Sequence, residues 1–207
     1  KSVMGIVPDI SNIYTELTAW ENLIFTGKLY GISKNRREER ATRLLKLFEL
    51  YDRRNEKTDG FSRGMRRRVC IAMALINDSK ILYLDEPTSG LDVKSVRNIR
   101  RLIRELNEDG LTVFLTTHNI EEASQMCDRI AIINRGKIAA IDTPENIRNA
   151  IKSNQAVEIS LKTPISGIQK LFEDISSVSE VQKRGDKIKL ITDDSVETLK
   201  HILKLID

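Results

Sequence analysis

The segment I-L-Y-L-D-E-P-T-S-G-L-D, residues 81–92, decides the fold of this chain. Four apolar residues are followed at once by turn residues, a pattern that predicts a short strand buried in a parallel sheet. Asp85 and Glu86 stand at its carboxyl end, where open α/β sheets bind their ligands. Because side chains alternate along a strand, the two carboxylates should leave it in different directions. One carboxylate can hold Mg²⁺ and the other can deprotonate a water molecule. The alternative is that both acids are simply solvated at the end of the strand.

Two further blocks flank this strand in the sequence. G-F-S-R-G-M-R-R-R, residues 60–68, precedes it, and L-T-T-H, residues 115–118, ends another apolar run. A helix N-terminus binds phosphate through its free N–H groups and partial positive charge, so the first block is a candidate phosphate loop. There Ser62 can add a hydroxyl donor and Gly64 allows close backbone approach. The alternatives are that Ser62 is an N-cap and nothing more, and that His118 is a capped or solvated residue.

In this order and spacing, the three blocks resemble those of the ABC-type ATPases, a branch of the P-loop NTPases. The resemblance covers residues 1 to about 150 and is most specific in E-P-T-S-G-L-D. It implies an α/β domain with a parallel sheet and a helical subdomain at about residues 10–78. The segment E-L-T-x-x-E-N-L followed by L-Y-G, residues 16–31, resembles the exporter-type branch, in which this region receives coupling helices of a membrane partner.

The resemblance also implies a role for each site residue. Asp85 would help to place Mg²⁺, Glu86 would be the general base on water, and His118 would hydrogen-bond the γ-phosphate of ATP. The remaining candidates would contact the nucleotide held by a partner subunit or sense the metal: Ser62, Arg63, Gly64, Met65, Asp92 and Asp9.

Three positions depart from the family pattern or stay open. Arg63 replaces the first glycine of a Ser-Gly-Gly core and Met65 replaces a common glutamine, and both substitutions are familiar in exporter-like members. Asp9 stands where a metal-sensing glutamine is expected, and it is either a Mg²⁺ contact or an ordinary turn residue after Pro8. The run 66–68, three arginines, either reaches phosphate or is solvated.

Local patterns predict the other elements of this part of the chain. Thr18 and Glu21 form a capping box, and Gly31 ends the helix that begins there. Trp20 and Phe25 are expected to pack into the core. Further expectations are a helix over 34–50 capped by Ser33, a helix over 93–108 capped by Asp92, a buried strand over 111–117, a hairpin over 129–141 and a helix that starts at Thr143-Pro144.

Residues 151–207 carry no catalytic motif and are expected to form a separate small α+β unit. Their pattern predicts the order β-α-β-β-α, part of a ferredoxin-like motif. This order resembles the C-terminal appendage of some exporter-type ATP-binding subunits. The expected elements are strands at 156–162, 178–183 and 187–192, helices at 165–173 and 195–206, and a turn at Arg184-Gly185-Asp186.

Composition bounds the class of protein. The 207 residues are 40% hydrophobic and 31% charged, the profile of a soluble globular protein, and no apolar run approaches the ~20 residues that span a bilayer. Cys70 and Cys127 are expected to be buried thiols of a reducing compartment rather than a disulfide. The net charge of +4 lies entirely within residues 1–150. This charge suits a protein that binds polyphosphate or lies against a membrane. By itself it does not indicate nucleic-acid binding.

The phosphate-binding pattern G-x-x-x-x-G-K-[ST] occurs nowhere in the 207 residues. The family places it upstream of residue 1, and it supplies the amide cradle and the lysine that hold the phosphates of ATP. We therefore expect a truncated P-loop NTPase domain that belongs to a longer native polypeptide. This chain alone should lack the main ATP pocket and be inactive.

These observations predict the ATP-binding subunit of an ABC transporter of the exporter branch, with ATP and Mg²⁺ as ligands. Its expected partners are a second ATP-binding subunit, as a homodimer, and a separate transmembrane permease at the cytoplasmic face of the cell membrane. Two alternatives stay open. One is a soluble ABC-type ATPase that acts on ribosomes or DNA. The other is a non-catalytic regulatory fragment, which would need none of Asp85, Glu86 and His118.

Overall fold

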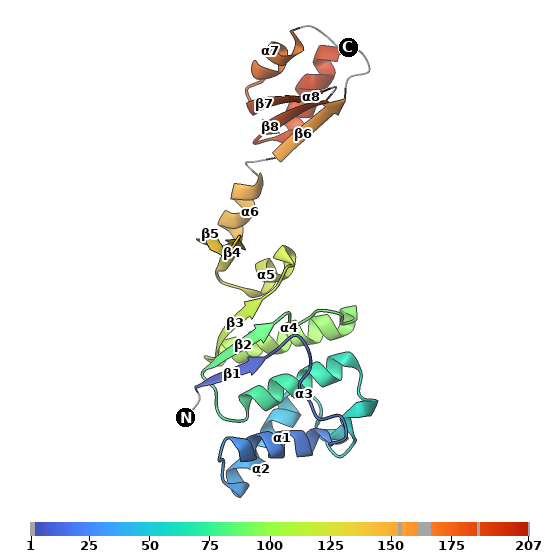
Figure 1. The fold of residues 1–207 in the computed structure, drawn as a ribbon, viewed down its shortest axis with the longest axis vertical. Coiled ribbons are helices and arrows are strands. Elements are labelled where there is room, and N and C mark those ends of the chain that lie inside the picture. Colours follow the sequence, from blue (N-terminus) through green and yellow to red (C-terminus); the bar gives the residue numbers. More distant parts are fainter. Residues whose placement is uncertain (1–2, 153–154, 161–166, 186, 207) are drawn as a thin grey trace. The chain divides into compact units, whose positions relative to one another are not determined.

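The computed structural model describes residues 3–152, 155–160, 167–185 and 187–206 (Figure 1). Residue contacts divide the chain into two units, Lys1–Glu122 and Ala123–Asp207, and each is described here by itself. The predicted limit of the ATPase domain near residue 150 stays a prediction.

The N-terminal unit is built on a parallel three-stranded sheet, which confirms the predicted α/β class. The strand order is β1-β2-β3, and Ile6, Tyr83 and Phe114 lie side by side in the register. Helix α3 packs against β1, and α4 packs against β3 (Figure 1). The bounds of these elements are β1 Met4–Val7, β2 Ile81–Asp85, β3 Thr112–Thr116, α3 Arg63–Leu75 and α4 Val93–Glu108.

One face of this sheet lies against α3 and α4. Val7, Leu82 and Leu84 are buried there, as the apolar run of the opening segment predicts. Gly5 lies so close to α3 that a Cβ atom built on it would stand 2.3 Å from the carbonyl oxygen of Ala74. The tight contact of β1 with α3 therefore depends on glycine at position 5.

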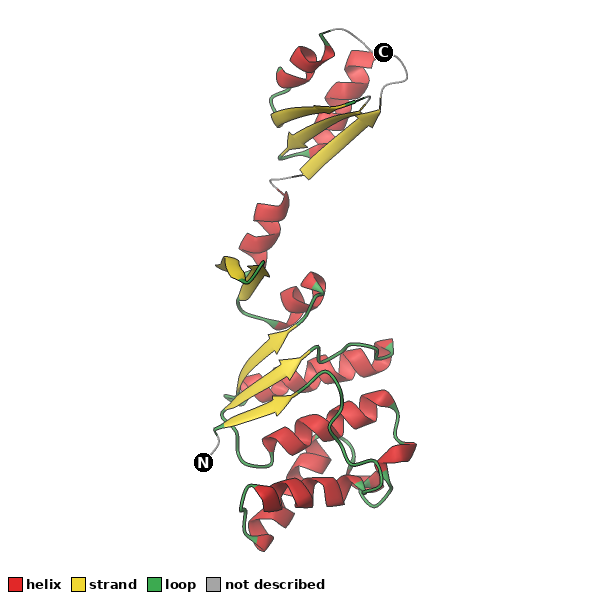
Figure 2. Ribbon diagram, in the orientation of Figure 1, coloured by secondary structure: helices red, strands yellow, loops and turns green. Residues whose placement is uncertain are grey.

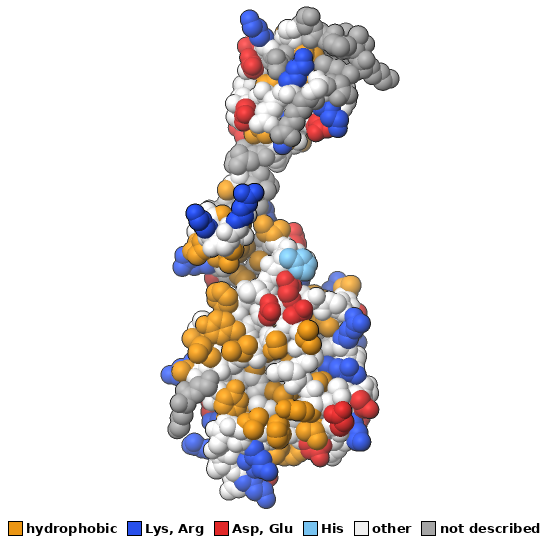
Figure 3. Space-filling model, viewed as in Figure 1, with side chains coloured by type: hydrophobic (Ala, Val, Ile, Leu, Met, Phe, Trp, Pro, Cys, Tyr) orange, Lys and Arg blue, Asp and Glu red, His pale blue; other side chains and the backbone are white. Residues whose placement is uncertain are grey.

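The opposite face of the same sheet is apolar and open. Met4, Ile6 and Phe114 are exposed on it, and Phe114 keeps 57% of its surface accessible. Hydrophobic side chains gather over these strands in Figure 3. The strand predicted over 111–117 is confirmed as β3, but the prediction that it is buried is wrong. Strand β3 lies at an edge of the three-stranded sheet, and its residues alternate between exposed and half-buried.

The helical part of this unit confirms the predicted capping box. Thr18 Oγ1 accepts a hydrogen bond from Glu21 N (3.1 Å), and Glu21 Oε2 accepts one from Thr18 N (2.8 Å). The helix ends at Leu29 with Tyr30 as its C-cap, and Gly31 follows with a φ of 69°. The elements of this part are α1 Ala19–Leu29, α2 Lys34–Leu47, η1 Tyr51–Arg53 and η2 Thr58–Gly60 (Figure 2).

Several details of these helices differ from the expectations. Phe25 keeps 36% of its surface exposed and packs edge-on against Tyr14. The buried side of α1 is formed by other residues: Ala19, Asn22, Leu23 and Gly27. Trp20 is only half-buried. Ser33 occupies the N-cap position of α2, but its side chain makes no capping hydrogen bond. That helix stops at Leu47 instead of running to residue 50.

The second unit begins within α5 (Ile120–Met126) and continues into the predicted hairpin. Strands β4 (Ile130–Asn134) and β5 (Lys137–Asp142) pair antiparallel, and α6 (Pro144–Lys152) follows. Thr143 Oγ1 accepts a hydrogen bond from Asn146 N (3.3 Å), which confirms Thr143 as the N-cap. A small apolar cluster joins these elements through Ala123, Ile130 and Ile147.

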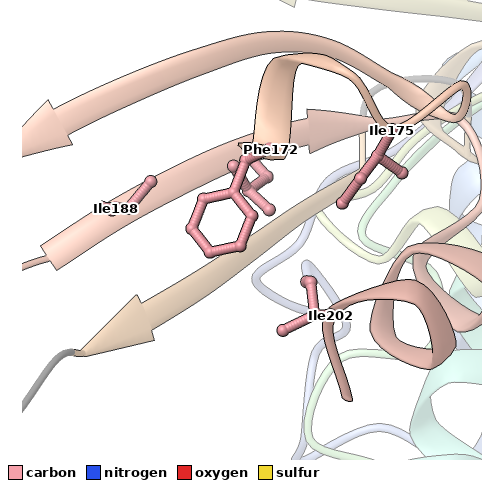
Figure 4. Packing of buried hydrophobic residues seen from close by; sticks show 5 residues of the cluster. Phe172, Ile175, Ile188 and Ile202 are labelled. Carbon is pink, nitrogen blue, oxygen red and sulfur yellow. The ribbon is translucent and has the colours of Figure 1, made fainter. Parts of the chain in front are cut away.

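The remaining elements confirm the predicted β-α-β-β-α order. Their sheet is antiparallel with the order β6-β8-β7, the arrangement of the first three strands of a ferredoxin-like motif. Phe172, Ile175, Ile188 and Ile202 form its core, with side chains from the sheet and both helices turned toward one another (Figure 4). The bounds are β6 Gln155–Ser160, α7 Ile168–Glu173, β7 Val178–Arg184, β8 Lys187–Thr192 and α8 Ser195–Ile206.

A few predicted positions lie outside the described residues: 161–162 of the first strand, 165–166 of the first helix, and Asp186 of the turn. Both cysteines are free thiols, as expected. Cys70 is buried, and burial raises the pKa of its thiol, whereas Cys127 is only partly buried.

Candidate functional site

The acidic pair lies where the sequence predicts it, at the carboxyl end of β2. The Asp85 carboxylate accepts a hydrogen bond from the Thr116 hydroxyl, and the main-chain N–H of Glu86 donates to the carbonyl of Thr116 (3.0 Å). Both acids are therefore tied to the end of the neighbouring strand β3. This follows from parallel pairing, which brings the carboxyl ends of adjacent strands to one edge.

Glu86 and His118 are in direct contact at that edge. Glu86 Oε1 accepts a hydrogen bond from the main-chain N–H of His118 (2.9 Å) and lies 2.9 Å from His118 Nδ1. The imidazole is 82% exposed and the Glu86 side chain 23% exposed. Glu86 also has a φ of 46°, in the left-handed region that few residues other than glycine adopt. Such backbone conformations gather at functional sites.

The electrostatics of this contact favour a charged histidine. The hydrogen bond and the negative charge of Glu86 raise the pKa of His118, and Glu122 adds to the effect. In the protonated ring, Nδ1–H donates to Glu86, and Nε2–H is a second donor that can serve a phosphoryl oxygen.

A buried carboxylate, Glu122, holds the loops on either side of this pair. Its side chain is about 2% exposed and accepts hydrogen bonds from the hydroxyls of Thr88 and Thr117 (2.8 Å for Thr117). Arg100 Nε lies 3.8 Å away. Glu122 is not among the site residues that the sequence predicted. The signal present in the sequence is its place in the pair Glu121-Glu122, which follows His118 closely.

The sequence left phosphate contact and solvation open for the three arginines at 66–68. In the structure each donates to main-chain carbonyl groups, and Arg66 and Arg68 stay partly exposed. Arg66 donates to the carbonyls of Thr58 (3.1 Å) and Asp59, and Arg68 donates to that of Phe48 (2.8 Å). Arg67 is only 4% exposed.

The Arg67 guanidinium binds the ends of β1 and β2 together. It donates to the carbonyls of Pro8 and Asp9 (3.3 Å for Asp9) and to those of Asp85, Glu86 (3.0 Å) and Pro87 (3.2 Å). Burial lowers the pKa of Arg67, and nearby acidic groups oppose that shift. Asp9 thus joins the site through its carbonyl oxygen, while its side chain is exposed.

The residues predicted to contact a partner's nucleotide lie at the starts of α3 and α4. Ser62 Oγ accepts from Met65 N (3.2 Å), so Ser62 is the N-cap of α3. Asp92 Oδ1 accepts from Ser95 N (2.9 Å) and caps α4, a bond that lowers the pKa of Asp92. Gly64 is buried, and a Cβ on it would stand 2.3 Å from Ser95 Oγ.

Gly64 therefore brings the starts of α3 and α4 together. Arg63 reaches the carbonyl of Gly90 (3.4 Å) from the same end of α3. The Met65 sulfur contacts Arg53 (3.2 Å). The structure thus places Ser62 to Met65 beside the segment that follows the acidic pair. Their contacts with a partner's nucleotide stay a prediction.

The acidic edge suits magnesium. Within the described residues, no three His, Cys, Asp or Glu side chains gather as a metal cage. Mg²⁺ commonly takes one or two protein carboxylates together with substrate phosphate and water. Asp85, exposed and oriented by Thr116, fits that use.

A parallel α/β sheet with two acids and a histidine at its carboxyl edge defines a ligand-binding α/β domain. Residues 1–89 match the model of one family, described as "ABC transporter". The chain belongs to the ABC transporter ATP-binding family.

Curated relatives agree with this assignment. The chain is 38% identical over 172 residues to the linearmycin resistance ATP-binding protein LnrL of Bacillus subtilis, an alignment that covers 83% of this chain and 54% of LnrL. It is 41% identical over 151 residues to the daunorubicin/doxorubicin resistance ATP-binding protein DrrA of Streptomyces peucetius, covering 73% of this chain and 46% of DrrA. The chain thus spans about half the length of these relatives.

Solved structures give the same result. A dimeric, post-hydrolysis state of the ATP-binding cassette MJ0796 bound to ADP and Pi matches with a TM-score of 0.59 and 34% identity, covering 69% of this chain and 63% of that one. The cbiO1 protein from Clostridium perfringens, part of the ABC transporter complex cbiONQ, matches with a TM-score of 0.66 and 26% identity, covering 70% and 59%. In the described part of the chain, no helix is long and apolar enough to cross a membrane.

Proposed function

We propose that this chain is part of the ATP-binding subunit of an ABC exporter and that Glu86 and His118 carry out its hydrolytic chemistry. The observation that carries the proposal is their contact at the carboxyl edge of the sheet, where Glu86 Oε1 lies 2.9 Å from His118 Nδ1. The curated relatives named above are ATP-binding proteins of antibiotic and drug resistance, which supports export as the process that is driven.

Each residue has a distinct task in this proposal. Both contacts with His118 use Glu86 Oε1, so the second carboxylate oxygen is the atom that takes the proton of the attacking water. His118, held by Glu86 through Nδ1, donates from Nε2 to an oxygen of the γ-phosphate. Asp85 binds the Mg²⁺ of Mg²⁺–ATP, a metal that neutralises charge on the phosphates when bound.

The partner-facing residues complete the proposal. Ser62 and Gly64, with Arg63, Met65 and Asp92, would contact the nucleotide held by a second ATP-binding subunit. That dimer would work at the cytoplasmic face of the cell membrane on a separate transmembrane permease. This chain alone is proposed to be inactive, because none of its 207 residues form G-x-x-x-x-G-K-[ST].

The test is Glu86→Gln in the full-length subunit assembled with its permease. The glutamine keeps the size of the side chain but cannot take a proton. We expect kcat for ATP hydrolysis to fall by about 10²- to 10⁴-fold, while ATP affinity stays within about twofold. The matched control is Glu121→Gln, an exposed carboxylate on α5. Hydrolysis by Glu86→Gln at the wild-type rate would remove Glu86 from the role of general base.

A further inference from the structure

The buried guanidinium of Arg67 joins three parts of the molecule that differ in function. It projects from α3, the helix that Ser62 caps. It donates to the carbonyl groups of Pro8–Asp9 after β1 and of Asp85–Pro87 at the end of β2. Five main-chain carbonyl groups from two separate loops therefore share one side chain.

Only arginine can make this arrangement among the natural side chains. Its planar head carries five N–H donors in a fixed fork, whereas lysine offers three donors from one point. Without the guanidinium, the carbonyl of Pro87 would lose a buried hydrogen bond, and the other four carbonyls would lose partly buried ones. Buried polar groups rarely stay unpaired in folded proteins. The loops would therefore shift to find other partners.

The loop after β2 is under a specific constraint. Glu86 has a φ of 46°, and a side-chain-bearing residue keeps such a conformation only where its surroundings determine it. Arg67 binds the carbonyl of Glu86 itself (3.0 Å) and those of the residues before and after it. The direction of the Glu86 side chain, and so its contact with His118, depends on this backbone.

We propose that Arg67 is a positioning residue that fixes the backbone of Glu86, so that its carboxylate meets His118 and the hydrolytic water. The expected effect on kcat rests on the proposed function. The expected effect on the contact between Glu86 and His118 is independent of ATP hydrolysis.

Arg68 provides a matched control. It lies on the same helix, its side chain is about 15% exposed, and it also donates to a main-chain carbonyl, that of Phe48 (2.8 Å). Burial lowers the pKa of Arg68 as it does for Arg67. Arg68→Met thus removes a comparable partly buried charge without touching the loop of Glu86.

The first experiment compares Arg67→Met, Arg67→Lys and Arg68→Met in the full-length subunit with its permease, below the lowest melting temperature of the set. We expect Arg67→Met to lower kcat by about 30- to 100-fold with KM for ATP within about threefold, because misplacing a reacting group by about 1 Å has costs of this size. Arg67→Lys should lie between Arg67→Met and the wild type. Arg68→Met should keep kcat within about threefold. An equal loss of kcat in Arg67→Met and Arg68→Met, or a raised KM at unchanged kcat in Arg67→Met, would overturn the proposal.

The second experiment needs no activity and uses the 207-residue chain. This chain contains two histidines, so NMR can follow the titration of the His118 ring directly. We expect Arg67→Met to move the His118 titration back toward about 6.5, because Glu86 leaves the ring, and Arg68→Met to leave it in place. If Arg67→Met does not fold, Arg67→Lys replaces it. An unchanged His118 titration in the folded variant contradicts the positioning role. A wild-type subunit without ATPase activity would instead contradict only the proposed function.

Discussion

The two three-stranded sheets among the described residues expose opposite kinds of surface. The parallel sheet of the N-terminal unit leaves Met4, Ile6 and Phe114 open on one face. The antiparallel β6-β8-β7 sheet turns charged side chains outward, where Lys187 pairs with Glu158 (2.6 Å), and keeps Ile188 and Leu190 inside. Each sheet packs its inner face against two helices of its own unit.

The difference follows from how many faces of each kind of sheet are normally exposed to water. An antiparallel sheet is stable with one face in water, and its strands then alternate between apolar and polar residues. Parallel sheets are normally covered on both faces, and their strands carry apolar residues on both. The C-terminal sheet is therefore complete by itself, whereas the outer face of the N-terminal sheet has the composition of a buried surface.

The comparison is tested most strongly by two phenylalanines, one inside the C-terminal core and one on the open face. Phe172→Ala should destabilise the C-terminal unit by about 3–5 kcal/mol, because it leaves a cavity among Ile175, Ile188 and Ile202. Phe114→Ala should cost less than about 1 kcal/mol, since Phe114 is already exposed. Hydrogen exchange of the amides of β8 and β2 measures both. Similar costs for the two changes would show that the open face is packed in solution.

The covered face of the N-terminal sheet gives the next largest effect. Gly5→Ala places a methyl group 2.3 Å from the Ala74 carbonyl oxygen, so β1 and α3 must separate. We expect a loss of about 1–3 kcal/mol in the free energy of unfolding, typical of an overpacked interior. Gly60→Ala is the control, because no atom lies within 4 Å of a Cβ at that glycine. Urea denaturation followed by circular dichroism compares the two, and an equal stability would contradict the close approach.

A smaller effect tests the open face itself. Phe114→Thr should lower the binding of the dye ANS to the chain, because it removes apolar surface that water now contacts. Its free energy of unfolding should change by less than about 1 kcal/mol. Glu158→Thr, on the outward side of β6, is the control and should leave dye binding unchanged. Unchanged dye binding in Phe114→Thr would indicate that this face is not the apolar surface exposed in solution.

The sequence predicted local elements well because their signals are local. The capping box at Thr18, the cap at Asp92 and the β-α-β-β-α order of the last unit all rest on residues a few positions apart. The end of β2 with Asp85 and Glu86 was equally predictable, since the apolar run and the turn residues adjoin it.

The failures concern contacts between distant segments. Whether Arg67 is solvated depends on loops 18 to 59 residues away along the chain, and nothing in the run of three arginines distinguishes the middle one. Glu122 is buried because Thr88 and Thr117 meet it from two loops. Phe114 was expected inside because its strand is apolar, but the pattern cannot show how many faces of a sheet are covered.

The smallest predicted effect compares the two histidines, one in each unit. The contact with Glu86 raises the pKa of His118, so the charged ring is favoured in the folded chain. Stability from this contact is then fully present below the pKa of an unfolded histidine, about 6.5, and is lost as pH rises through the raised pKa. His201 contacts the carbonyl of Glu197 (3.1 Å) and provides a second ring signal in the same NMR titration. Glu86→Gln should move the His118 midpoint downward and leave the His201 signal in place. A His118 midpoint that does not respond to Glu86→Gln would mean that the two side chains are apart in solution. The candidate site would then not exist in the form described.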